Sequence, residues 1–180
     1  MKYIRKIDSI GRWDGTATPL YKGAFSTGDI LLSELKTEHN TLSIWGYDNE
    51  DEKDEVLAAM ALTRHHIDRL AYVMMDEAYI DKLGIPLKPE EGVADGIIRK
   101  EILQRHVNLT EIDFWRLGYV AEYISKLAHN KEDRFQLSDK KVYQLIERHI
   151  IKKNIDFNLV NATLQASFAR AQQKYGTKAA

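Results

Sequence analysis

The amino-acid sequence predicts an α+β fold, with a small mixed β-sheet in the N-terminal half and a helical C-terminal half. Two observations support this class. Residues 41–75 show a strand–helix–strand pattern, and after residue 110 the apolar residues recur at intervals of three and four, as in amphipathic helices. The chain has 180 residues, of which 44% are hydrophobic and 29% charged, so it is long enough and apolar enough to bury a real core.

The strand–helix–strand pattern predicts a βαβ-like unit. Residues 41–47 alternate, with Leu42 and Ile44 on one face of a strand. A helix is predicted over residues 50–67, with Asn49 as its N-cap and Glu52 completing a capping box. The apolar run at 70–75 is typical of a buried strand. These lengths suit two strands joined by a crossover helix.

The flanking segments of the first half are shorter. The stretch KYIRKI predicts a strand, Ser26 is expected to cap a short helix, and EAYIDKL predicts a short helix ended by Gly84. The segment 85–96 contains two Pro and two Gly and is predicted to be an exposed loop. We therefore predict an α/β part over residues 1–88 and a helical part over 93–176, joined by this loop into one compact unit.

Helix signals dominate the second half. Thr110 is predicted as an N-cap, with Asp113 at the third position of its helix, and Ser138 as the N-cap of a later helix. A last helix is expected to carry Phe157 and Tyr175 on one apolar stripe. The first of these helices is predicted to bury one side along its length, in a stripe formed by Ile112, Trp115, Tyr119, Val120, Tyr123, Ile124 and Leu127.

Several classes of protein are disfavoured by composition and motifs. The chain has no Cys, so it forms no disulfide and no thiolate metal site. The first residues lack the apolar run of a signal peptide, no stretch is long and apolar enough for a membrane span, and we expect a cytoplasmic protein of bacterial or phage origin. Phosphate-binding, hydrolase and zinc-protease motifs are absent. The adjacent His65 and His66 point about 100° apart on a helix, so we predict no metal and no cofactor.

The charge is unevenly distributed along the chain. Residues 1–92 hold 11 Lys and Arg against 17 Asp and Glu, whereas residues 93–180 hold 15 against 10. The acidic run at 50–55 complements the dipole at the start of its predicted helix. The asymmetry is typical of a surface for an oppositely charged partner, and it equally allows the two halves to attract each other.

Arg99 and His106 are the candidate catalytic residues. Seven positions apart on a helix, they would lie on one face, where a His can move a proton from a 2′-hydroxyl and an Arg can stabilise a phosphate. The spacing resembles the R-x(4–6)-H signature of the helical HEPN ribonucleases, although Lys100 stands where that family has Asn, Asp or His. The match covers two residues, so we predict that residues 99–106 are a structural, solvent-facing segment and keep a metal-independent ribonuclease as an alternative.

A basic segment in the second half is a candidate nucleic-acid surface. Its cations would neutralise phosphates and its one aromatic residue would stack on a base. No sequence-reading motif accompanies it. The residues concerned are Lys140, Lys141, Tyr143, Arg148, Lys152 and Lys153.

The function predicted from sequence is a protein-interaction module without catalytic activity, such as an immunity protein, an antitoxin or a subunit of a defence or regulatory complex. An acidic first half favours a basic protein partner, and residues such as Trp45 and Trp115 offer anchors for it. A nucleic-acid-binding subunit is the first alternative. No membrane partner is expected.

Overall fold

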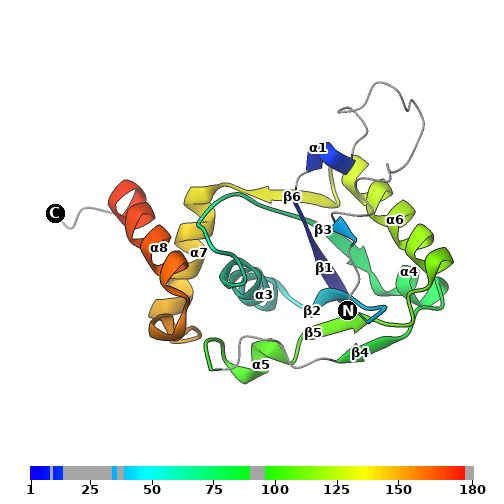
Figure 1. Cartoon of the computed structure of the whole chain (residues 1–180), viewed down its shortest axis with the longest axis horizontal. Coiled ribbons are helices and arrows are strands. Elements are labelled where there is room, and N and C mark those ends of the chain that lie inside the picture. Colours follow the sequence, from blue (N-terminus) through cyan, green and yellow to red (C-terminus); the bar gives the residue numbers. More distant parts are fainter. Residues whose placement is uncertain (9, 14–33, 36–38, 90–95, 177–180) are drawn as a thin grey trace.

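The computed structural model describes residues 1–8, 10–13, 34–35, 39–89 and 96–176, and it has an α+β fold as predicted. Six strands form one sheet in the order β4-β5-β2-β1-β3-β6 (Figure 1). Every pairing between neighbours is antiparallel, which corrects the prediction of a mixed sheet. The strands are β1 (Lys2–Ile7), β2 (Leu42–Tyr47), β3 (Leu70–Asp76), β4 (Leu87–Pro89), β5 (His106–Leu109) and β6 (Arg134–Leu137).

Helices cover both faces of the sheet. One core cluster joins the sheet to α3, α5, α7 and α8, and a second cluster joins its other face to α1, α4 and α6 (Figure 1). Alternation within the strands separates the clusters, because Ile4 packs in the first and its neighbour Tyr3 in the second. The helices are α1 (Ile10–Trp13), α3 (Glu50–Leu62), α4 (Glu77–Lys82), α5 (Lys100–Leu103), α6 (Phe114–His129), α7 (Asp139–Ile151) and α8 (Ala162–Tyr175), with a 3-10 turn, η1 (Phe157–Leu159).

The strand–helix–strand pattern is present as β2, α3 and β3, although its helix ends five residues earlier than predicted. Strand β1 lies between β2 and β3 and is antiparallel to both, so the two strands of this unit are parallel without being neighbours. The capping prediction is confirmed, because the Asn49 side chain accepts a hydrogen bond from the Glu52 amide. The Glu52 carboxylate accepts from the amide of Asp48, one residue before the cap, whereas a capping box would use the amide of Asn49 itself.

The second half is not wholly helical, which corrects one prediction. Strand β5 pairs with β2 and β4, and β6 pairs with β3, so both halves of the chain contribute to the same sheet. Helix α6 begins after Asp113, whose side chain accepts from the amide of Arg116. Thr110, the predicted cap, is buried and donates its hydroxyl to the carbonyl of Pro86. The Ser138 cap is confirmed, and Ser26 lies outside the described residues.

Strands β1 and β2 separate towards one end. Their pairing covers only Lys2–Ile4 with Trp45–Tyr47, and beyond this point no ladder joins them. The Arg5 guanidinium bridges the gap: Nη1 donates to the carbonyl of Ser43 at 2.7 Å and Nη2 to the carbonyl of Glu34 at 2.8 Å. A side chain here does what backbone hydrogen bonds do along the rest of the pair.

Both outermost strands of the sheet are short. Strand β4 has three residues, including Lys88 and Pro89, and β6 has four, beginning with Arg134. Proline has no amide hydrogen to offer a further strand. The sheet therefore ends in a short strand on either side, and the longer strands β1, β2 and β3 lie between these two.

Candidate functional site

Arg99 and His106 do not share a helix face, so the geometry expected of a nuclease pair is wrong. Helix α5 is only one turn long, with Arg99 before its first residue, and His106 opens strand β5. The two side chains make different contacts. The Arg99 guanidinium donates to the Asn154 side chain at 3.3 Å and pairs with Glu101 at 3.3 Å.

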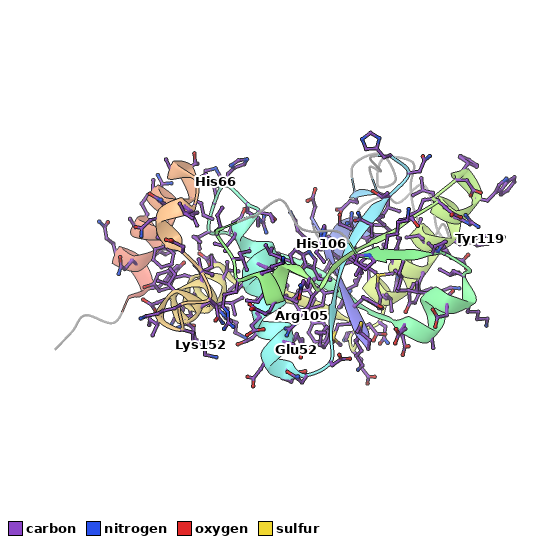
Figure 2. The ribbon with its side chains drawn as sticks, turned by 90° about the horizontal axis from the view of Figure 1, so that it is seen from below. Glu52, His66, Arg105, His106, Tyr119 and Lys152 are labelled. Atoms are coloured by element: carbon purple, nitrogen blue, oxygen red, sulfur yellow. The ribbon has the colours of Figure 1, made fainter. Side chains whose placement is uncertain are left out.

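His106 is half-buried against the sheet rather than solvent-facing as predicted. Strands β2 and β5 pair His106 directly with Trp45, and their ring centroids lie 4.7 Å apart with a tilt of 40°. This contact follows from the register, because residues opposite each other in an antiparallel pair project to the same face. The imidazole also lines a cavity at the separated end of β1 and β2. It occupies the middle of the molecule in Figure 2.

The basic segment keeps its exposed lysines but loses its aromatic residue. Lys140, Lys141, Lys152 and Lys153 are exposed, whereas Arg148 pairs with Asp54 of α3. Tyr143 is only 1% exposed, and its hydroxyl donates to Glu147. It packs in the core between α7 and α8, so this ring does not stack on a base.

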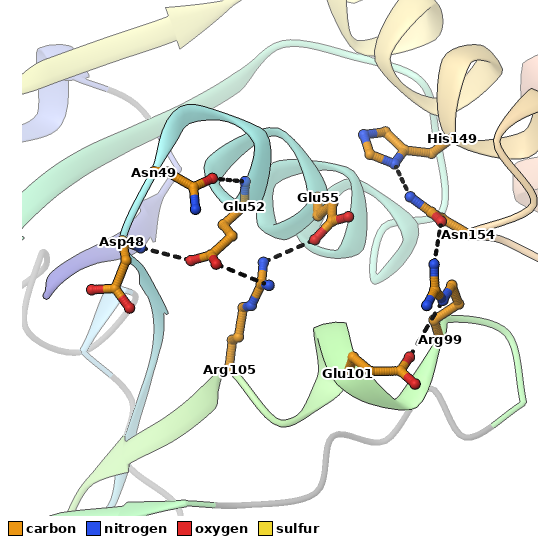
Figure 3. Close-up of polar contacts among 9 residues, drawn as sticks. All are labelled: Asp48, Asn49, Glu52, Glu55, Arg99, Glu101, Arg105, His149 and Asn154. Atoms are coloured by element: carbon orange, nitrogen blue, oxygen red, sulfur yellow. Dashed lines mark hydrogen bonds and ion pairs between the residues drawn. The ribbon is translucent and has the colours of Figure 1, made fainter.

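The acidic run at 50–55 is largely paired within the molecule. Arg105, which precedes β5, contacts Glu55 at 2.9 Å and Glu52 at 3.4 Å (Figure 3). Arg148 of α7 pairs with Asp54. Both arginines come from the basic second half of the chain. The charge asymmetry of the sequence therefore serves in part to hold α3 to the second half.

An aromatic patch, formed by Phe114, Trp115 and Tyr119, lies on the first half of α6. These side chains are 83%, 74% and 55% exposed, and the first two rings meet edge to face at 6.0 Å between centroids. Trp115 and Tyr119 were expected in the buried stripe, and this prediction is wrong. The buried residues of α6 begin only at Val120, and the helix as a whole contacts β3, β6 and α1.

Charged residues border the aromatic patch. Asp113 caps the helix immediately before it, and Arg116, within the same turn, pairs with Glu111 at 3.3 Å. Further along, Lys126 pairs with Glu122 at 2.7 Å. An apolar centre bordered by charged groups has the composition of a protein–protein interface.

The patch lies far from the basic lysines. Figure 2 shows Tyr119 and Lys152 towards opposite ends of the molecule. Within the described ranges, no three His, Asp or Glu side chains gather where they would hold a metal ion. None of the helices in that part of the chain has the length and apolar character to cross a bilayer.

Comparisons with protein families, with curated proteins and with solved structures found no match for this chain.

Proposed function

We propose that this protein is an interaction module that binds another protein through the aromatic patch of α6. The observation that supports the proposal is the exposure of Phe114, Trp115 and Tyr119 on one helix, where the first two rings are in contact and Tyr119 follows Trp115 by four residues, one turn further on the same side. Large apolar side chains exposed singly need no explanation, whereas contiguous ones are typical of interaction sites. Trp and Tyr are also the residues that contribute most often to binding energy at interfaces.

The proposed partner is a protein with an apolar groove and a basic border. Around the aromatic patch, Glu111 and Glu122 are each matched by one cation, and Asp113 adds a carboxylate without forming an ion pair to another described residue. The border is therefore net acidic. A basic border on the partner would complement it and speed association.

The two alternatives have less support. Binding to nucleic acid rests on four exposed lysines after the loss of Tyr143 as a stacking residue. Cleavage of RNA requires Arg99 and His106 to act on one phosphate, and they contact different neighbours, Asn154 and Trp45.

The test compares two variants, each of which replaces two large apolar residues of matched exposed fraction by serine. W115S/Y119S removes side chains exposed by 74% and 55%, and the control I151S/L159S removes side chains exposed by 76% and 55% at other sites. Each tagged protein is incubated with lysate of its own organism, and every protein captured by the wild type is purified and its Kd measured. We expect W115S/Y119S to weaken binding at least about 30-fold and the control to leave it unchanged.

Equal binding by both variants, or no partner with a measurable Kd, would contradict the proposal. Sedimentation of the pure protein tests whether the patch binds a second copy of the same chain instead. A concentration-dependent dimer that W115S/Y119S abolishes would make a second copy of the chain the occupant of the patch, and would rule out a different partner there. Thermal unfolding of both variants must show that each is folded.

A further inference from the structure

The separated end of β1 and β2 opens into a cavity of about 480 Å³. It lies between the sheet, the last turn of α3, α5 and the start of α8. Its volume falls in the range of roughly 300 to 1,000 Å³ that is typical of small-molecule sites. The aromatic patch on α6 is not part of it.

The walls of the cavity are mainly apolar. Leu62 and Met60 come from the end of α3, Leu103 from α5, and Ile97 and Ile98 from the segment before α5. Two aromatic rings, those of Trp45 and His106, also line the cavity from neighbouring strands, with their centroids 4.7 Å apart and their planes tilted by 40°. An apolar, planar group can stack on one of these rings and meet the other with its edge.

The charged residues that line the cavity are all basic. Arg5 and Lys6 lie on its sheet side with His106, and no Asp or Glu is among its described lining residues. Glu34 and Asp8 lie close enough to Arg5 to counter its charge, and both guanidinium Nη groups already donate to backbone carbonyls. The charge of Arg5 is thus countered by nearby carboxylates, and its hydrogen bonds are already made within the fold, which leaves Lys6 as the cation for a ligand.

Lys6 differs from Arg5 in having no ion pair with another described residue. Burial is the main reason that the pKa of Lys6 is lowered, and the nearby Arg64 lowers it further, while Asp8 and Asp68 partly oppose this. An anion within hydrogen-bond distance of a half-buried ammonium stabilises its charged form, because it replaces the water that burial has removed.

We propose that this cavity binds a small organic anion, whose flat apolar body packs against the rings of Trp45 and His106 and whose carboxylate or phosphate accepts from the Lys6 ammonium. The apolar walls and the ring pair account for the body, and the one-sided basic lining accounts for the negative charge. The site is separate from the aromatic patch, so the protein would carry a ligand at one place and a partner at another.

The test uses two anions and their neutral counterparts. Naphthalene-2-carboxylate and adenosine 5′-monophosphate are titrated to about 1 mM, alongside naphthalene-2-carboxamide and adenosine, while the indole N–H signals of the protein are followed by NMR. We expect an anion to shift the Trp45 signal and leave that of the exposed Trp115 in place. A response to only one anion tells whether a carboxylate or a phosphate is preferred.

Variants then test the role of Lys6. We expect K6Q to weaken anion binding at least about tenfold, because a charged hydrogen bond is lost, while K2Q, at the exposed start of the same strand, changes nothing. I97W is expected to fill part of the cavity and reduce binding of both anions. W115S/Y119S should bind them as the wild type does, so failure of the proposed interaction function leaves this test intact.

Three results would overturn the proposal. These are a neutral compound that binds as tightly as its anion, an anion that binds K6Q and wild type equally, and no shift of the Trp45 signal by either anion at the highest concentration.

Discussion

At the scale of single residues, His149 shows how one hydrogen bond sets the state of a buried ring. His149 is 1% exposed, and the Asn154 amide lies 3.0 Å from its Nδ1 (Figure 3). The Asn154 side-chain oxygen accepts a hydrogen bond from Arg99, so the NH₂ group of Asn154 faces the His149 ring. His149 must then accept at Nδ1 and carry its proton on Nε2, which is the neutral form.

We predict that His149 makes the protein lose stability in mild acid. Burial is the main cause that lowers the pKa of His149; Lys152 and Arg148 lower it further, while Asp54 and Glu55 oppose them. Below about pH 6.5, the ordinary pKa of His, the unfolded chain takes up a proton that the folded chain does not. The free energy of unfolding should therefore fall between pH 6.5 and the lowered pKa, and be unaffected by this group above pH 7.

The measurement is urea unfolding at pH 7 and pH 5 for the wild type, H149Q and H65Q. In H149Q, the free energy of unfolding should decrease less between pH 7 and pH 5 than in the wild type. One proton accounts for a slope of at most about 1.4 kcal/mol per pH unit. H65Q removes an exposed His and should keep the wild-type slope. An H149Q protein with the full slope would contradict the assignment.

At this scale, some residues of the proposed sites could be named from the sequence and others could not. Trp115 could be named as a partner anchor from its residue type alone, because Trp is common at the centre of protein interfaces. Its exposure could not be predicted, because a helical repeat shows which residues share a side but not how far the sheet extends beneath it. Lys6 and His106 meet in the cavity from positions 100 residues apart in sequence, and no local pattern reports such a meeting.

At the scale of elements, Arg5 is the link between two strands whose ladder ends early. Removing it leaves the carbonyls of Ser43 and Glu34 without that donor and the two strand ends without a bridge. Burial lowers the pKa of Arg5 to about 10, which leaves it charged at neutral pH. Hydrogen bonds from a charged donor are each worth about 1.5 to 3 kcal/mol in stability.

We therefore predict that R5M lowers the free energy of unfolding by about 3 kcal/mol, allowing for partial replacement by water. K2M, in the exposed first position of the same strand, should stay within about 0.5 kcal/mol of the wild type. Urea unfolding at pH 7 measures both. A loss below about 1 kcal/mol in R5M would show that the strand ends do not depend on this bridge.

Elements were predictable where their local signals were strong. Strand β2 alternates over six residues, and α3 and α7 start at capping side chains, so these came within a few residues of their observed bounds. Strands β5 and β6 have only four residues each, too few to show a period, and half of the side chains in their segments HVNL and RFQL are polar. Their strand form is imposed by pairing with β2 and β3.

At the scale of the whole molecule, the two halves of the chain are interleaved. The sheet takes four strands from the first half and two from the second, and the core cluster around α3 includes Val142, Ile146 and Leu164. Arg105 and Arg148 add ion pairs between the halves. Within the segment 85–96, predicted to be an exposed loop, residues 87–89 form strand β4 of the same sheet, and residues 90–95 lie outside the described residues.

This arrangement predicts a single unfolding transition. For the full chain, circular dichroism and tryptophan fluorescence should give the same midpoint in urea. Residues 1–88 expressed alone should show no cooperative transition, because β2 and β3 lose their outer neighbours and α3 loses the helices packed on it. A sharp transition in that fragment would mean that the first half is an independent folding unit.

The short outer strands have a consequence for self-association. An exposed strand edge invites pairing with another chain, and short edges that carry charge and proline discourage it. Lys88 and Pro89 stand at one edge of the sheet and Arg134 at the other. A partner is therefore not expected to extend this sheet by adding a strand of its own. The protein should remain dispersed at concentrations where a long, flat edge would seed aggregates.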